Sequence, residues 1–387
     1  GFLDARRALS FLEELPAGQS WVGDLSASAD PDQALLQAVR LREADPGLVD
    51  ALSRDERARR RVCSILGGSQ WLGDYVIADP ARAAAINEDP GDPREVLYEA
   101  VGARTVGRGV WVAAREATAD DLRAAYRRVL LHLAADDLTS GTPEDIMPSV
   151  GARIADLVDA TLDAGLALAR RDVDPEGTVP FAIIAMGKTG ARELNYISDV
   201  DVIYVAEAGE DGDERSALEK ATRLASATAS ACSGPGTQAP LWTVDANLRP
   251  EGRNGVLVRT IASYRQYWDK WAQTWEFQAL LKARACAGDP ELGRAFEEAA
   301  QPYVWSASAR EGFVEAARAM RRRVEDNISR SHASRELKLG RGGLRDVEFT
   351  VQLLQLVHGR TDAFLRVRST LDAIEALREG GYIARSD

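Results

Sequence analysis

The chain has 387 residues, 45% of them hydrophobic, so it can bury a sizeable core and fold into two or three domains. Its 48 basic and 60 acidic residues give a net charge of −12, which argues against a general nucleic-acid-binding or anionic-membrane surface. We therefore expect no nucleic acid and no membrane among its partners, but rather proteins and small molecules bound with metal.

Residues 1–178 alternate apolar patterns of helical period with short polar breaks, as in PDQALLQAVRLREAD and ARIADLVDATLDAGLALARRD. These patterns predict an all-helical N-terminal domain over 1–178. The stretch DVDPEGTVP at 172–180 then reads as a linker, and PFAIIAMG predicts a buried strand directly after it.

The middle of the chain changes from the helical period to strand patterns. We expect strands at 181–186, 200–206 and 240–248, with a glycine turn and short helix at 187–197 and a longer helix at 213–232. From 261 onward the pattern is helical again, through TIASYRQYWDKWAQTWEFQALLKARACAG. The sequence thus predicts a mostly helical α+β protein, in which a small mixed β-sheet domain (179–260) is flanked by helical domains (1–178 and 261–387).

The cysteines and apolar runs indicate the compartment. Cys63, Cys232 and Cys286 are scattered and lack the CxxC spacing of a zinc site. No apolar run approaches the roughly 18 residues of a membrane-spanning helix. The N-terminal GFLDARRALSF also lacks the apolar core of a signal peptide. We expect a cytoplasmic protein.

The motif MGKTGARELNYISDVDVIYV at 186–205 carries the chemistry. Its glycines could let backbone N–H groups approach a phosphate, although a tight strand–helix turn would need the same residues. Asp199 and Asp201 are two apart at a strand start, so both carboxylates should lie on one side, and LWTVDANLRP brings a third, Asp245. Three carboxylates beside a phosphate cradle indicate nucleotidyl transfer with two Mg²⁺ or Mn²⁺ ions.

Four ordered motifs carry a family resemblance: FAIIAMGKTGARELNYISDVDVIYVAE, VDANLRPEG, WEFQALLKARACAGD and ELKLGRGGLRDVEF. Together they resemble the bifunctional glutamine synthetase adenylyltransferase/adenylyl-removing enzymes over most of residues 178–360. That family joins two nucleotidyltransferase halves, and this chain has room for one. RELNY and Arg345 in GGLRDVEF resemble the N-terminal, adenylyl-removing half, and the final REGGYIARSD reads as though cut from a longer chain.

The resemblance implies a nucleotidyltransferase-type sheet domain with defined site residues. Asp199, Asp201 and Asp245 would be catalytic and hold the metal ions. The residues expected to bind phosphate or nucleotide are Gly187, Lys188, Ser198, Arg249, Lys282, Lys338 and Glu348. Two of these have structural alternatives, since Arg249 could form a surface salt bridge and Glu348 could favour the first turn of its helix.

The activity implied by the resemblance is metal-dependent phosphorolysis in the regulation of nitrogen assimilation. Phosphate would attack the adenylyl phosphorus on the modified tyrosine of adenylylated glutamine synthetase and release ADP. A PII-type signalling protein is implied as a further partner. Two alternatives stay open: the same fold working in the adenylyltransferase direction with ATP, and a non-catalytic regulatory module that binds nucleotide or a signalling protein.

Overall fold

The computed structural model describes residues 1–209, 212–326 and 336–384. By its internal contacts the chain forms two compact units. The first consists of Gly1–Ala100 and Asp120–Leu157, and the second of Val101–Ala119 and Val158–Asp387. The long helix α10 (Pro143–Val173) contributes residues to both units.

The first unit is helical. Aspartates cap several of its helices: Asp30, Asp45 and Asp55 each accept a hydrogen bond from the backbone N–H three residues on. Its core centres on α3 and α5, where Leu35 and Ile65 are fully buried. Besides part of α10, the elements are α1 (Ala5–Leu12), α2 (Gly18–Ala27), α3 (Pro31–Ala44), α4 (Pro46–Arg54), α5 (Glu56–Gly68), α6 (Gln70–Ile77), η1 (Pro80–Ala83), α7 (Ala84–Asn87), α8 (Pro93–Ala100) and α9 (Ala119–Leu138).

The second unit contains the β-structure and the remaining helices. The strands are β1 (Arg104–Val106), β2 (Val110–Val112), β3 (Phe181–Ala185), β4 (Val200–Ala206), β5 (Val244–Asp245), β6 (Val258–Arg259) and β7 (Arg284–Gly288). The helices are α11 (Gly187–Ala191), α12 (Glu214–Ser233), η2 (Gly252–Asn254), α13 (Ile261–Lys270), α14 (Thr274–Leu280), α15 (Pro290–Ser306), η3 (Ala307–Ala309), α16 (Phe313–Asp326), α17 (Leu344–His358), η4 (Ala363–Leu365) and α18 (Thr370–Glu379).

The principal sheet is mixed and has the order β5-β4-β3-β7, with β6 also paired to β4. Strand β3 runs antiparallel to both β4 and β7, whereas β5 and β6 run parallel to β4. Since β3 occupies one side of β4, β5 and β6 follow one another along its other side. Every residue of β3 is buried, and Asp201 is the one residue of β4 that is not.

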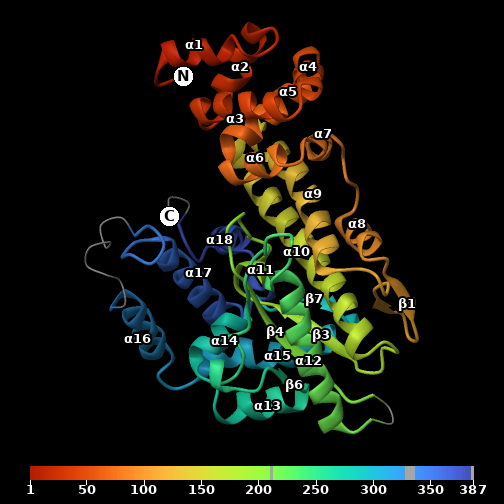
Figure 1. Ribbon diagram of the computed structural model, residues 1–387. Coiled ribbons are helices and arrows are strands. Elements are labelled where there is room, and N and C mark those ends of the chain that lie inside the picture. The colour runs from red at the N-terminus through yellow and green to blue at the C-terminus, as the bar shows by residue number, and fades with distance from the viewer. Residues whose placement is uncertain (210–211, 327–335, 385–387) are drawn as a thin grey trace. The chain divides into compact units, whose positions relative to one another are not determined.

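Helices cover this sheet within the second unit (Figure 1). Ile184 and Ile203 of the sheet share a buried cluster with Tyr264, Trp268 and Phe296 from α13 and α15. Helix α12 packs against β4, β5 and β6, and its buried residues lie outside that cluster. Because strand side chains alternate between faces, we place α12 on the opposite face. Helices therefore cover both faces of the sheet.

The expectation that residues 1–178 are all helical is wrong at residues 104–112. There β1 and β2 form an antiparallel hairpin in which Thr105 pairs with Trp111. The intervening Gly107 and Gly109 have φ angles of 49° and 85°, values that glycine adopts without strain. β-Branched and aromatic residues flanking these glycines favour the hairpin over a helix.

The expectation that the chain is helical from 261 onward is also wrong at one point. Residues Arg284–Gly288 form β7, an edge strand of the principal sheet. Their composition, RACAG, carries little strand propensity, so pairing with the buried strand β3 decides their conformation. The strand expected at 240–248 is confined to Val244–Asp245, because the chain then turns sharply through residues 246–255.

The mostly helical α+β fold with a small mixed sheet is confirmed. The division into domains at 1–178, 179–260 and 261–387 stays a prediction, and the compact units follow other boundaries because 101–119 and 158–178 belong with the sheet. Among the described residues, no helix is both long and apolar enough to cross a bilayer.

A buried ion pair fixes the entry to the sheet and provides a test of the fold. Arg170 and Asp174, with side chains 3% and 1% exposed, are joined at 2.7 Å. Asp174 also accepts hydrogen bonds from Thr178 and from the backbone of Val179. We expect Asp174→Ala to lower the free energy of unfolding by about 3–5 kcal/mol, because Arg170 is left buried without its partner.

Urea denaturation followed by tryptophan fluorescence measures this loss. The matched control is Glu219→Ala, which removes an exposed partner of Arg215 in another i,i+4 pair and should cost about 0–0.5 kcal/mol. Equal losses in the two variants would contradict the assigned role of the buried pair.

Candidate functional site

A cavity of about 1000 Å³ lies at the end of the sheet where β3 finishes and β4 begins. It is bounded by the turn after β3, the segment leading into β4, helices α14 and α17, and the residues just before α17. Eight of the ten site residues expected from the sequence line it: Gly187, Lys188, Ser198, Asp199, Asp201, Lys282, Lys338 and Glu348.

Gly187 allows the turn after β3 to pass close to the aspartate strand. Its φ angle is 52°, which a residue with a side chain rarely adopts, and a Cβ atom there would lie 2.6 Å from Asp201 Oδ2. The backbone N–H of Met186 donates to the carbonyl oxygen of Asp201 at 2.8 Å. Any larger residue at 187 would therefore push into the aspartate that the cavity exposes.

Arg284 holds the same turn from behind. Its guanidinium donates to the carbonyl oxygens of Thr189 and Gly190 and forms two hydrogen bonds of 2.6 and 3.0 Å with the carboxylate of Asp159. A Cβ atom at Gly190 would lie 1.9 Å from the carbonyl oxygen of Lys282, so the chain leading into β7 passes directly against the turn. Strand β7, which the sequence analysis did not predict, thus positions the glycine turn, which the sequence analysis did predict.

The aspartates lie on neighbouring strands. Asp201 of β4 and Asp245 of β5 are partners in the parallel register, and Asp199 directly precedes β4. The pKa of Asp201 is raised to about 6, chiefly by burial and also by the charges of Asp245 and Asp199, while the charges of Lys338 and Arg345 oppose the rise. The repulsion shows that the carboxylates act on one another, which a bound cation would relieve.

The donor set fits a hard divalent cation. Carboxylate oxygens from adjacent strands are the ligands that Mg²⁺ and Mn²⁺ prefer, and Mg²⁺ often binds through one or two carboxylates together with substrate phosphates. Among the described residues, no three histidine, cysteine or acidic side chains gather closely enough to hold a metal on their own. Asp201 and Asp245 could therefore hold an ion whose other ligands come from elsewhere, and the number of ions stays a prediction.

Positively charged side chains line the cavity together with Asp199 and Asp201. Burial lowers the pKa of Lys188, and the neighbouring charges of Lys338, Lys282 and Arg345 lower it further, whereas Glu348 opposes them. Several cations held this close to one another favour a bound anion. A cavity lined by both carboxylates and cations suits a phosphate group bound together with a metal ion.

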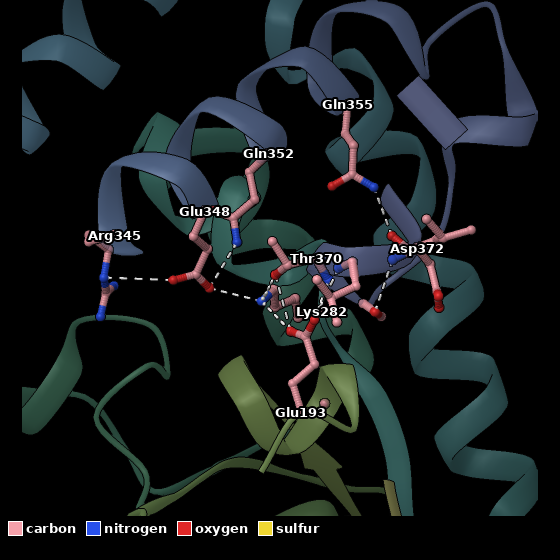
Figure 2. A network of polar contacts seen from close by, with 12 residues as sticks. Glu193, Lys282, Arg345, Glu348, Gln352, Gln355, Thr370 and Asp372 are labelled. Carbon is pink, nitrogen blue, oxygen red and sulfur yellow. Dashed lines mark hydrogen bonds and ion pairs between the residues drawn. The ribbon is translucent and has the colours of Figure 1, made fainter. Parts of the chain in front are cut away.

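Lys282 is the centre of a polar network beside this cavity (Figure 2). Its Nζ donates to Glu193 Oε2 at 3.1 Å, to Glu348 Oε1 at 2.8 Å and to Thr370 Oγ1 at 3.0 Å. The residue is 4% exposed, and its three N–H donors match these three acceptors. The structure thus gives Lys282 three protein partners, and its expected contact with phosphate stays a prediction.

Glu348 continues the network toward Arg345. Burial alone would raise the pKa of Glu348, but Lys282 and Arg345 outweigh it and hold the pKa below its usual value. Glu348 Oε2 lies 3.7 Å from Arg345 Nε, and its Oε1 is shared between Lys282 and the amide of Gln352. Glu348 is therefore ionised and braced within the cavity wall.

The other two expected residues, Asp245 and Arg249, do not line this cavity. Asp245 stands beside Asp201 in the sheet. The guanidinium of Arg249 donates to the backbone carbonyl oxygens of Ala246, Arg253 and Gly255, so it stabilises the turn after β5. Its expected contribution near the metal stays a prediction.

Sequence reasoning assigned no site role to three residues that the structure brings forward. Arg345 lines the cavity, Glu193 binds Lys282, and Arg284 fixes the glycine turn. Glu193 in RELNY and Arg345 in GGLRDVEF stood within the motifs that carry the resemblance. Those motifs were the available signal, because the partners of the Glu193 carboxylate lie 89 or more residues away in the sequence and the exposure of Arg345 to the cavity depends on the tertiary fold.

Comparison with known families shows to which family this chain belongs. Residues 59–299, more than half of the chain, match the family model described as glutamate-ammonia ligase adenylyltransferase. The chain belongs to that family. Residues 318–387 match a second model, described as GlnD PII-uridylyltransferase. The resemblance inferred from the four motifs is confirmed.

Similar proteins carry the name bifunctional glutamine synthetase adenylyltransferase/adenylyl-removing enzyme. One from Cutibacterium acnes is 48% identical over 94% of this chain and 38% of its own length. Those from Streptomyces coelicolor and Mycolicibacterium smegmatis are each 47% identical, over 100% and 94% of this chain and 39% and 36% of their own lengths. The chain thus spans less than half the length of these relatives.

The raised pKa of Asp201 predicts a pH-dependent effect on stability. In the folded protein Asp201 binds its proton more tightly than in the unfolded chain, so its charge destabilises the fold above about pH 6. This penalty disappears as the pH falls from about 6 toward the ordinary value of 3.8. We expect Asp201→Asn to stabilise the metal-free protein at pH 8 by about 1–2 kcal/mol, after allowance for solvent screening.

Denaturant unfolding in EDTA at pH 8 and pH 4.5 measures this effect. The difference between Asp201→Asn and the parent should shrink markedly at the lower pH. A stability difference that is independent of pH would show that the pKa of Asp201 is not raised in the folded protein.

Proposed function

We propose that this chain is a metal-dependent nucleotidyltransferase that removes AMP from the adenylylated tyrosine of glutamine synthetase by phosphorolysis. The observation that carries the proposal is the cavity lined by Asp199 and Asp201 together with Lys188, Lys338 and Arg345, with Asp245 next to Asp201 in the sheet. Membership of the adenylyltransferase family and the names of the relatives support the substrate. The adenylyl-removing direction rests on the RELNY and GGLRDVEF motifs.

In this reaction an oxygen of orthophosphate forms a bond to the adenylyl phosphorus, and the bond from that phosphorus to the tyrosine oxygen breaks. ADP leaves, and the tyrosine oxygen gains a proton. One or two Mg²⁺ or Mn²⁺ ions at Asp199, Asp201 and Asp245 would supply charge stabilisation and activation of the attacking oxygen. The chain itself supplies no covalent nucleophile in this scheme.

The residues of the chain orient the reactants and compensate their charge. Lys188, Lys338 and Arg345 stand where they can neutralise phosphate oxygens. Gly187 keeps the turn backbone clear of Asp201, and Ser198 donates from its hydroxyl to the carbonyl oxygen of Asp199, which steadies the aspartate segment. Catalysis would then consist of positioning and electrostatic stabilisation.

A PII-type signalling protein is part of the proposal as a second partner. Its support is the match of residues 318–387 to the model described as GlnD PII-uridylyltransferase. These residues include α17 and α18, which also brace the cavity through Glu348 and Thr370. Binding on this segment could therefore alter the cavity wall.

The direction of the reaction can be read from the co-substrate. Adenylylated glutamine synthetase is incubated with the chain and Mg²⁺ or Mn²⁺, with either phosphate or ATP added. We expect phosphate to release ADP and restore the unmodified tyrosine. AMP transfer from ATP onto the unmodified enzyme would establish the adenylyltransferase direction instead, and no reaction with either would support a non-catalytic binding module.

Asp201→Asn should separate catalysis from folding. The substitution keeps the shape of the side chain but removes a metal-binding charge, so we expect phosphate-dependent ADP release to fall about 100-fold or more. Asp213→Asn is the matched control, because asparagine can still cap α12 and the charge lost lies outside the cavity lining. Near-normal ADP release by Asp201→Asn would overturn the catalytic role of the aspartates.

A further inference from the structure

The network around Lys282 separates residues that can bind an anion from residues that cannot. The ammonium of Lys282 is buried and donates to Glu193, Glu348 and Thr370, at distances between 2.8 and 3.1 Å. A lysine has three N–H donors, so an anion could reach this one only by displacing a protein partner. The residue is therefore built to hold other groups in place.

Glu193 joins this lysine to the glycine turn and to α18. One carboxylate oxygen accepts from the backbone N–H groups of Thr370 and Leu371, at 2.5 and 3.4 Å. The other accepts from Lys282 Nζ and from the Thr370 hydroxyl, each at 3.1 Å. The backbone N–H of Glu193 donates to the carbonyl oxygen of Lys188 at 2.9 Å. Glu193 thus ties the turn that lines the cavity to α18 directly and to α17 through Lys282.

Arg345 differs from Lys282 in that its donors are not all used by protein acceptors. Its Nε–H is buried and has no hydrogen-bond partner, although it lies 3.7 Å from Glu348 Oε2. The side chain is one-third exposed, lines the cavity, and has its guanidinium carbon 5.6 Å from the centre of the Phe349 ring. A planar guanidinium with unused donors matches phosphate oxygens, which it can bind through two parallel hydrogen bonds.

We propose that Arg345 binds the phosphate of the nucleotide in this cavity and that Glu193, acting through Lys282 and Glu348, is the positioning residue that holds Arg345 toward it. The inference rests on the proposed function for the identity of the anion.

The physical link is the sharing of Lys282 between two carboxylates. With Glu193 in place, Lys282 engages one oxygen of Glu348 and leaves the other facing Arg345 (Figure 2). If Glu193 loses its charge, Glu348 becomes the only anionic partner of the lysine described here. Glu348 should then turn toward Lys282, and Arg345 should lose the charge that orients it.

Calorimetric titration of the full chain with ADP in Mg²⁺, and separately with inorganic phosphate, tests this inference. We expect Arg345→Gln to weaken ADP binding about tenfold or more and Arg345→Lys to recover only part of the loss. Glu193→Gln should weaken ADP binding about threefold to fivefold, and should add nothing in the Arg345→Gln background, because both act through one guanidinium. Arg341→Gln is the control, since this exposed arginine of the same glycine-rich turn does not line the cavity.

The outcomes are distinguishable. Unchanged ADP affinity in folded Arg345→Gln overturns the binding role. A lower melting temperature of Glu193→Gln with unchanged affinity, or an equal loss in both backgrounds, shows that Glu193 is merely structural. If Glu193→Gln does not fold, Thr370→Val is the substitute variant. It removes one acceptor of Lys282 without changing any charge.

The proposed function can fail separately. Tight ADP binding that depends on Arg345, without phosphate-dependent ADP release from adenylylated glutamine synthetase, sinks the reaction and leaves the binding inference standing. Normal ADP release from adenylylated glutamine synthetase, with an ADP affinity that does not depend on Arg345, overturns the binding inference and leaves the proposed reaction standing. A parent chain that binds neither ADP nor phosphate overturns both.

Discussion

A buried ammonium group organises the functional half of this protein. Lys282 lies between α14 and β7, and its three donors reach the segment after the glycine turn, helix α17 and the start of α18. Such a group is costly to bury unless every donor and nearby charge is matched. The carboxylates that match it, Glu193 and Glu348, therefore tie the segment after the glycine turn, α17 and α18 to one another.

The cavity holds charges in an arrangement that folding alone would not favour. Burial and two neighbouring carboxylates raise the pKa of Asp201, and burial and neighbouring cations lower the pKa of Lys188, so the neutral form of each is favoured. These shifts cost stability, which the buried sheet and its aromatic cluster offset. Metal and phosphate would bring the missing counter-charges, and this explains why sites for charged ligands commonly carry such perturbed groups.

Some features of this protein follow from residues close together in the sequence, and others depend on contacts between distant residues. Glycine at 187, the alternation of Asp199 and Asp201 and the helix α12 were readable because each depends on neighbours within a few residues. The strand β7 was not, because its small residues become a strand only by pairing with β3, about a hundred residues earlier in the chain. Arg249 was read as a charge beside the metal, yet its donors turn back onto their own loop.

The sequence by itself determined the mostly helical fold, the buried strands, the aspartate motif and the family, since these follow from residue type and short spacing. Only the tertiary structure decided which cationic side chain pairs with which anionic one. Lys282 lies 66 to 89 residues from the partners of its ammonium group, and no local pattern encodes that choice. The pairing is set by burial, because only where water is excluded must each charge find one particular partner.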